Sequence, residues 1–137
     1  IFINNMKDPN NPCIFCNFIN HNVVDQNELV YASYDSYPVT DQHCLIIPKR
    51  HIKDYFELTN DEVIACYQLI NKVKKIIETK DSSVKGFNIG TNSGKTAGQS
   101  IMHCHIHLIP RRVGDVEKPQ GGVRSVIPLK QHYVRKA

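Results

Sequence analysis

Three histidines alternate with other residues near the end of the chain, in the segment Met102–Pro110 (MHCHIHLIP). In an extended strand, alternate side chains share one face. The segment therefore predicts an apolar face and a face of three imidazoles. The apolar face consists of Cys104, Ile106 and Leu108, and the imidazole face of His103, His105 and His107. Chance alternation on a solvated face is the competing interpretation, but such faces usually carry Lys, Glu, Thr or Ser.

The spacing of these imidazoles limits their charge. Alternate residues on a strand lie about 7 Å apart, so three cations would repel one another and at least one ring is expected to be neutral. A neutral imidazole offers a lone pair, which a nucleophile and a metal ligand both require. The segment therefore predicts a chemical site.

A long helix is predicted over residues 61–79. Thr59 and Glu62 match a capping box at its start. Apolar residues then recur at three- and four-residue spacing, which predicts one buried stripe. The stripe consists of Val63, Cys66, Tyr67, Ile70, Val73 and Ile77.

The remaining periodic segments predict strands and a short N-terminal element. The first two strands are close enough to pair antiparallel, and Pro48 and Pro110 each end a strand. We expect an α+β domain with a mainly antiparallel sheet of about five strands, one long helix and a short N-terminal helix. The predicted strands are 28–33, 44–47, 87–90 and 100–109, and the short helix or turn is 13–18.

Composition places the chain among ordinary globular proteins. Its 137 residues suit one domain, with 41% hydrophobic and 22% charged residues. No apolar run approaches the roughly 20 residues that span a bilayer, and no stretch resembles a signal peptide, so we expect a cytoplasmic protein without membrane contact. The net charge of +4 fits an anionic ligand or an ordinary surface. The basic residues lack interleaved aromatics, so no nucleic-acid partner is expected.

The five cysteines fall into two groups. Cys44, Cys66 and Cys104 lie singly in apolar segments and are expected to be buried thiols. Cys13 and Cys16 form a C-x-x-C pair, which in an intracellular protein favours a metal or redox site over a structural disulfide. A redox pair normally lies in a thioredoxin-like βαβ unit, and the sequence shows no such pattern.

The histidine segment resembles the signature of the histidine-triad (HIT) family, with AGQS at residues 97–100 before it. Residues 42–52 (QHCLIIPKRHI) are similar to a second family segment, with Gln42 in place of the usual small residue. The resemblance covers residues 13–112 and leaves a loose lead-in, 1–12, and a C-terminal extension, 113–137. It implies a HIT-like fold and a homodimer that joins two sheets into one.

The resemblance also implies a two-step displacement on a nucleotide. His105 would attack the α-phosphorus to form a nucleotidyl-histidine, and water would release a nucleoside monophosphate. A backbone carbonyl would hold the other nitrogen of the ring, and we expect that acceptor in the loop 91–98. Further residues at the family spacing would donate to the phosphate or the leaving group or orient them: His107, Ser100, Gln99 and Asn92.

Four more residues match nucleotide-binding positions of the family, each with an open alternative. His43 is near the triad in relatives, or is a buried histidine that satisfies a backbone group. Asp35, eight residues earlier, matches the acid that binds the ribose, or accepts backbone hydrogen bonds in a turn. Ile14 and Phe15 occupy the slots that sandwich the base, or belong to the core.

In a subset of the family, the C-x-x-C pair holds zinc together with two histidines. The matching residues here are Cys13, Cys16, His51 and His103. Four protein ligands leave no position for water, so the resemblance implies a structural Zn²⁺. Two thiols without a metal are the alternative.

The C-terminal extension is similar to that of microbial HIT proteins described as diadenosine-polyphosphate hydrolases. The expected function is therefore a HIT-family nucleotidyl hydrolase or transferase acting on dinucleoside polyphosphates or related adenosine nucleotides. A purine nucleoside phosphoramidase and a nucleotide-binding regulatory protein with slow turnover are the alternatives. Residues 121–124 (GGVR) would bring a cation over the polyphosphate or form a turn at a subunit edge.

Overall fold

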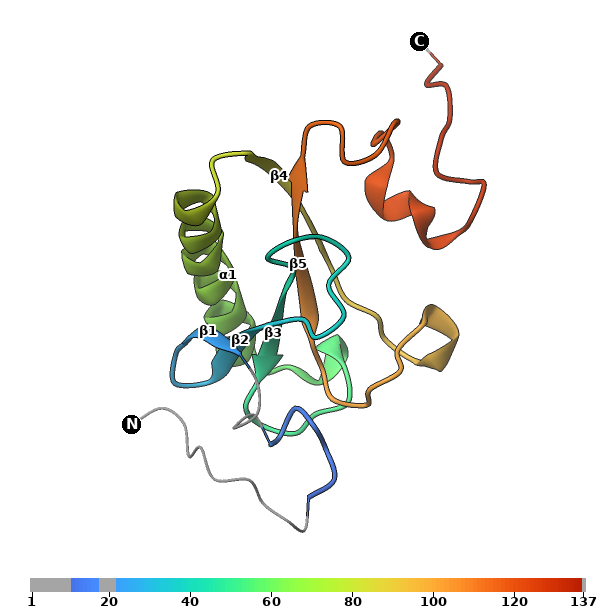
Figure 1. Ribbon diagram of the computed structural model, residues 1–137. Coiled ribbons are helices and arrows are strands. Elements are labelled where there is room, and N and C mark those ends of the chain that lie inside the picture. The colour runs from blue at the N-terminus through green and yellow to red at the C-terminus, as the bar shows by residue number, and fades with distance from the viewer. Residues whose placement is uncertain (1–10, 18–21, 137) are drawn as a thin grey trace.

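The computed structural model describes residues 11–17 and 22–136, which form an antiparallel sheet with a long helix against one face (Figure 1). The strand order is β1-β2-β3-β5-β4. The expected sheet of about five strands with one long helix is thus confirmed. The strands are β1 (Val23–Gln26), β2 (Val30–Tyr34), β3 (Cys44–Pro48), β4 (Val84–Gly90) and β5 (Ile106–Arg112).

The hairpin of β2 and β3 is confirmed, with Tyr31 opposite Ile47 and Ser33 opposite Leu45. Strand β1 has no counterpart among the predicted strands. At the N-terminal end, residues 14–16 form a turn in which the N–H of Asn17 donates to the carbonyl of Cys13 at 3.2 Å. The described residues show this turn and no helix there. Residues 1–10 of the lead-in and residue 18 lie outside the described part of the chain.

The long helix, α1 (Asn60–Lys80), begins at the predicted capping box. The hydroxyl of Thr59 accepts the N–H of Glu62 at 3.1 Å, and the Glu62 carboxylate accepts the N–H of Thr59 at 2.9 Å. The same carboxylate binds the guanidinium of Arg50 through both oxygens, at 2.7 and 3.1 Å. Arg50 thereby ties the start of α1 to the chain that leaves β3.

The predicted stripe on α1 is partly wrong. Cys66, Val73 and Ile77 are buried against the sheet, but Val63 and Tyr67 remain 37% and 69% exposed. The buried line lies on a neighbouring stripe of the helix and includes Ala65 and Leu69. Val63 and Tyr67 instead line a groove together with Phe87 and Ile89 of β4.

The final strand also differs from its prediction. β5 begins at Ile106 and runs through Pro110 to Arg112, so His103, Cys104 and His105 precede it. Proline is tolerated because β5 pairs with β3 only as far as Leu108, and at Pro110 its remaining partner is β4.

Two clusters of buried residues cover the two faces of the sheet. Residues facing α1, such as Ala32, Ile46 and Leu108, form the larger core. On the other face, Phe15 packs with Tyr31, Leu45 and Ile47 and the Tyr31 hydroxyl donates to the carbonyl of Phe15 at 2.6 Å. This contact attaches the N-terminal turn to the sheet beside the histidines.

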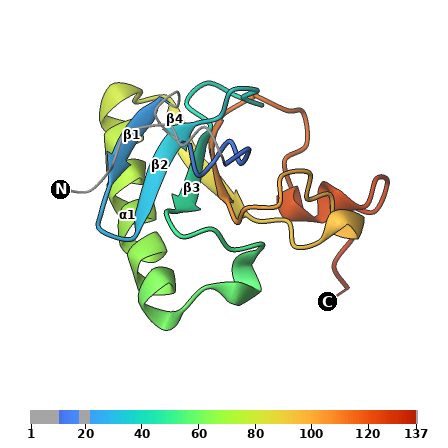
Figure 2. The same ribbon diagram turned by 90° about the horizontal axis from the view of Figure 1, so that it is seen from below.

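Three short 3-10 helices complete the described structure: η2 (Tyr55–Glu57), η3 (Lys95–Ala97) and η4 (Gly122–Val126). Figure 1 and Figure 2 both show α1 and the C-terminal extension, coloured orange to red, on opposite sides of the sheet. Within the described ranges, no helix combines the length and the apolar run needed to cross a membrane.

Candidate functional site

The three histidine rings of the motif lie in a row but differ in burial and in partners. His107 lies on β5, and its ring centre is 5.4 Å from that of His105. His103 is fully buried and turns toward Cys13 and Cys16. Phe15 contacts the rings of both His103 and His105, with ring centres 6.0 and 5.0 Å away, although regular strand begins only at Ile106. The motif therefore divides into the adjacent rings of His105 and His107, of which His107 lines a cavity, and the buried ring of His103.

The ring of His105 is oriented by its own chain. Its Nδ1 lies 2.8 Å from the carbonyl oxygen of His103. A carbonyl only accepts, so Nδ1 carries a proton, and in the neutral ring the lone pair is therefore on Nε2. The prediction that this acceptor lies in the loop 91–98 is wrong, because the ring reaches the carbonyl two residues before it. From that loop, the Thr91 hydroxyl donates to the carbonyl of His105 at 2.7 Å. Phe15 packs edge-on against this ring, with 5.0 Å between the two ring centres.

His43 fixes the proton of His107 through a chain of hydrogen bonds. The N–H of Val39 donates to Nδ1 of His43 at 3.1 Å, so the proton of a neutral His43 is on Nε2. That N–H donates to Nδ1 of His107 at 2.9 Å, which leaves the proton of His107 on its own Nε2. His43 is therefore buried against a backbone group and also contacts the triad through His107.

Burial keeps this pair neutral. It lowers the pKa of His43, although the nearby Asp35 carboxylate opposes the shift. It also lowers the pKa of His107 to about 4, with further contributions from the charges of His105 and His43. At neutral pH, His107 is thus a neutral donor beside the lone pair of His105.

Asp35 serves a turn with one oxygen and faces His43 with the other. Oδ1 accepts the N–H of Tyr37 at 2.8 Å, and Oδ2 lies 3.5 Å from Nε2 of His43.

The two candidate base-binding residues differ in burial. Phe15 is in the core and touches His105, whereas Ile14 is 51% exposed.

The side chain of Gln99 is engaged by backbone groups of its own loop and of Lys53. Oε1 accepts the N–H of Gly94 at 2.9 Å, and Nε2 donates to the carbonyls of Lys53 and Ile101 at 2.6 and 3.0 Å. These bonds use both amide hydrogens, so the amide shapes the loop instead of offering the expected donor to a phosphate. Ser100, next in the chain, is exposed.

Four possible metal ligands converge beside the buried ring: Cys13, Cys16, His51 and His103. Nδ1 of His103 lies 3.4 and 3.5 Å from the two sulfurs and 3.1 Å from Nδ1 of His51, and Cys16 Sγ lies 3.2 Å from the latter nitrogen. Around a tetrahedral zinc ion, N···N and S···N separations are about 3.3 and 3.5 Å. The donor set and its spacing therefore fit zinc.

The outer nitrogen of His103 is fixed as well. Nε2 donates to the carbonyl of Pro48 at 2.8 Å, which leaves the Nδ1 lone pair directed at the cysteines. Burial lowers the pKa of His103 to about 4, so the ring is neutral as a ligand must be. By contrast, burial raises the pKa of Cys44, Cys66 and Cys104 to about 12, 11 and 12, as expected for inert thiols.

A cavity of about 690 Å³ opens beside His107 and Asn92. Its far wall is built by the C-terminal extension, including η4. Arg124 does not line it, because its guanidinium donates to the carbonyls of Lys130 and Gln131 at 2.9 and 3.1 Å. Of the two expectations for residues 121–124, a cation over the polyphosphate is therefore not observed in this structure.

Several groups that orient the site are backbone atoms, and sequence reasoning missed them. They are the N–H of Val39 and the carbonyls of Pro48 and His103. Every residue carries such groups, so no sequence signal distinguishes these three. Thr91 was not predicted as a site residue by itself, although it lies in the loop 91–98, which was predicted to contact His105.

Comparison with known proteins agrees with this geometry. A family model described as the HIT domain matches residues 17–114. An uncharacterised HIT-like protein of Methanocaldococcus jannaschii is 40% identical over 120 residues, which cover 83% of this chain and 91% of that protein. An adenosine 5'-monophosphoramidase of Candida albicans is 30% identical, with 73% of this chain and 70% of that protein covered. The crystal structure of a zinc-bound histidine triad family protein from Mycobacterium smegmatis matches with a TM-score of 0.70 at 29% identity, and the match covers 76% of this chain and 78% of that one. The chain belongs to the HIT family.

Proposed function

We propose that this protein is a nucleotidyl hydrolase that works through a covalent intermediate on His105. The observation that carries the proposal is the hydrogen bond from Nδ1 of His105 to the carbonyl of His103, which places the lone pair of the neutral ring on Nε2. In the first step, the Nε2 lone pair forms a bond to the α-phosphorus, and the leaving group departs with the electron pair of its own bond. In the second step, water attacks the phosphorus, the electron pair returns to Nε2, and a nucleoside monophosphate is released.

His107 is the proposed donor to the phosphoryl or leaving-group oxygen. Its Nε2–H is available because His43 occupies Nδ1, and its low pKa keeps the ring neutral. A departing polyphosphate leaves as an anion and requires no proton, whereas a departing amine must gain one. A neutral donor therefore favours dinucleoside polyphosphates as substrates.

A purine nucleoside phosphoramidate is the second candidate substrate, because one relative is named as an adenosine 5'-monophosphoramidase. A purely regulatory nucleotide-binding protein is the less supported alternative, since binding alone does not require the free lone pair that His105 retains. Turnover of both substrate classes by one preparation of protein separates these functions.

The nucleoside of the attacked nucleotide is proposed to lie on the Phe15 side of His105. Ile14 is exposed there for contact with the base, and Oδ2 of Asp35 is the proposed acceptor for the ribose hydroxyls. Ser100, presented by the loop that Gln99 shapes, and Asn92 are the proposed phosphate contacts.

We further propose that Cys13, Cys16, His51 and His103 hold a structural Zn²⁺. Four of the six separations between their donor atoms are close to the edges of a tetrahedral zinc site, and all four positions are protein atoms. A zinc ion there would attach the N-terminal turn, and with it Phe15, to the chain that leads into His105.

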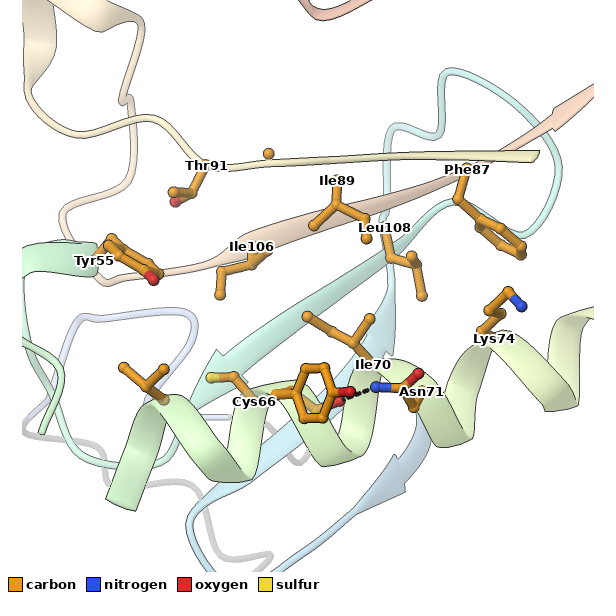
Figure 3. A pocket seen from close by; sticks show the side chains of 13 residues that line it. Tyr55, Cys66, Ile70, Asn71, Lys74, Phe87, Ile89, Thr91, Ile106 and Leu108 are labelled. Atoms are coloured by element: carbon orange, nitrogen blue, oxygen red, sulfur yellow. Dashed lines mark hydrogen bonds between the residues drawn. The ribbon is translucent and has the colours of Figure 1, made fainter. Parts of the chain in front are cut away.

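A homodimer is proposed across the open edge of β4. Figure 3 shows an apolar groove between this edge and α1, with Ile70, Phe87 and Ile89 along it. β4 ends the sheet, so its outer edge presents unpaired backbone groups, and an antiparallel strand of a second copy satisfies them by two-fold symmetry. The same contact would cover the groove.

The function is tested by turnover of diadenosine tetraphosphate, diadenosine triphosphate and adenosine phosphoramidate. The wild-type protein is expected to release AMP, and His105→Ala to lower kcat by about a thousandfold or more. Retention of the wild-type Tm by His105→Ala would show that the loss is chemical. Turnover of all three substrates at the rate of His105→Ala would refute the enzymatic proposal.

A further inference from the structure

The cavity beside His107 continues along β5 away from His105. Alternate residues of a strand share a face, and His107, Ile109 and Arg111 all line this cavity. The opposite wall belongs to the C-terminal extension, which contributes Val123 and Val126. The cavity thus begins at the proposed leaving-group donor and ends under a segment outside the HIT-domain match, which stops at residue 114.

The extension is fixed against the sheet. Arg111 binds both oxygens of Asp115, at 2.8 and 2.9 Å, and donates to Asn88 of β4 at 2.7 Å. Gly122 lies so close to Asn88 that an added Cβ would come within 3.0 Å of the amide nitrogen. The guanidinium of Arg124 donates to the carbonyl of Gln131 and so holds the later part of the extension against η4. The wall is therefore preformed.

The lining suits a largely uncharged organic group with polar edges. The Asp115 carboxylate neutralises Arg111, and Lys118 is the other cation that lines the cavity. Amides stand among aliphatic side chains, and a volume of about 690 Å³ lies within the usual range for small-molecule sites. The amides are Asn88, Asn92 and Gln131, and the aliphatic residues are Val39, Ile89, Ile109, Val116, Val123 and Val126.

We infer that this cavity binds the second nucleoside of a dinucleoside polyphosphate, the nucleoside that departs with the leaving group. The inference rests on the proposed function. In-line displacement places the leaving group opposite the attacking nitrogen, so the leaving phosphates point away from Nε2 of His105. They then lie along β5, past His107. The remote nucleoside then meets the extension. A phosphoramidate that releases only ammonia has no group to place there, so the extension determines substrate preference.

The test compares two matched substitutions on the extension. Val126 lines the cavity and Val134 does not, and the two are 74% and 93% exposed, so both accept a polar residue without loss of the core. In the His105→Ala background, calorimetry gives the Kd of diadenosine tetraphosphate and the Kd of AMP. Val126→Asp is expected to weaken dinucleotide binding about tenfold relative to AMP binding, and Val134→Asp to leave the ratio unchanged.

An unchanged ratio in Val126→Asp would overturn the inference, as would equal affinity of the unsubstituted protein for the dinucleotide and AMP. The outcome is separable from that of the proposed function. Binding is measured without turnover, so a protein that hydrolyses nothing still decides whether this subsite exists. With the catalytically intact protein, the ratio of kcat/KM for the dinucleotide to that for adenosine phosphoramidate is expected to fall by the same factor in Val126→Asp.

Discussion

Nε2 of His43 lies 2.9 Å from Nδ1 of His107, and the N–H of Val39 lies 3.1 Å from the other nitrogen of His43. The peptide N–H can only donate, so the direction of both hydrogen bonds is determined. His43 therefore keeps the proton of a neutral His107 on Nε2, the nitrogen that we propose faces substrate, and so is a proposed positioning residue.

Replacement of His43 is expected to act through that proton. His43→Ala should lower kcat about tenfold with little change in KM, because His107 is then free to adopt either tautomer. His43→Gln carries an amide N–H close to the position of Nε2 and should recover most of kcat. Steady-state kinetics and the ¹⁵N shifts of His107 check this. Equal losses in the two variants, or an unchanged tautomer of His107 in His43→Ala, would contradict it.

The proposed zinc site predicts one metal ion per chain. Cys16→Ser is expected to reduce bound zinc to near zero and to lower Tm by about 5 °C or more, because metal affinity is coupled to folding. Cys66→Ala, which removes a buried thiol remote from the cluster, should keep the zinc. Metal analysis and thermal unfolding measure both effects. Undiminished zinc in Cys16→Ser would rule out the ligand set.

The proposed dimer predicts that a charge on the β4 edge separates the subunits. Ile89 and Ile64 are about equally exposed, at 51% and 53%, but only Ile89 lines the groove of Figure 3. Ile89→Lys should therefore give a monomer, and Ile64→Lys should remain a dimer. Sedimentation equilibrium distinguishes them. A monomeric wild-type protein at micromolar concentration would end the proposal.

Glu62 is expected to make stability depend on pH. The hydrogen bonds from Arg50 lower the pKa of this carboxyl below its ordinary value of 4.5. A carboxyl whose pKa is lower in the folded state stabilises the fold above its unfolded pKa, and this contribution is lost as pH falls through the folded value. Glu62→Gln should cost about 1 kcal/mol at pH 7 and progressively less below about pH 4.

Denaturant titration of Glu62→Gln at several pH values measures that difference. Asp61→Asn is the control, since it removes an exposed acid from the same helical turn. A cost for Glu62→Gln that stayed constant down to pH 3 would show that the charge has no part in it.

The sequence predicted secondary structure best where the pattern depends on residues that are close together in the chain. The capping box of Thr59 and Glu62 placed the start of α1 within a residue, because both side chains bond to backbone groups nearby. The hairpin of β2 and β3 followed from two apolar runs joined by turn residues. These features depend on a few neighbouring residues, which a single sequence displays.

Features that depend on tertiary packing were not predictable in the same way. Strand β1 is only four residues long and carries two polar residues, so its sequence pattern does not predict a strand. It forms because it pairs with β2. Pro110 was taken as a stop, yet it lies inside β5 because one side of that strand is unpaired there. The face of α1 that is buried depends on where the sheet lies, and the apolar pattern alone fits two adjacent stripes.

The candidate site likewise combines features that the sequence predicted with features that depend on tertiary structure. The identity of the four possible metal ligands followed from the family pattern, and the structure brings their donor atoms together. The strand predicted over residues 100–109 was wrong at its start, because β5 begins only at Ile106. The roles of individual nitrogens required the positions of backbone carbonyls and amides, which no residue type reveals.

The central claim is that Nε2 of His105 forms a bond to phosphorus, and trapping the intermediate tests it most directly. Wild-type protein mixed with diadenosine tetraphosphate and quenched in alkali within one turnover should gain the mass of one adenylyl group, and peptide mapping should place it on His105. His105→Ala should gain nothing and should turn over at least about a thousandfold more slowly. An adenylyl group on another residue, or rapid hydrolysis by His105→Ala, would contradict the account.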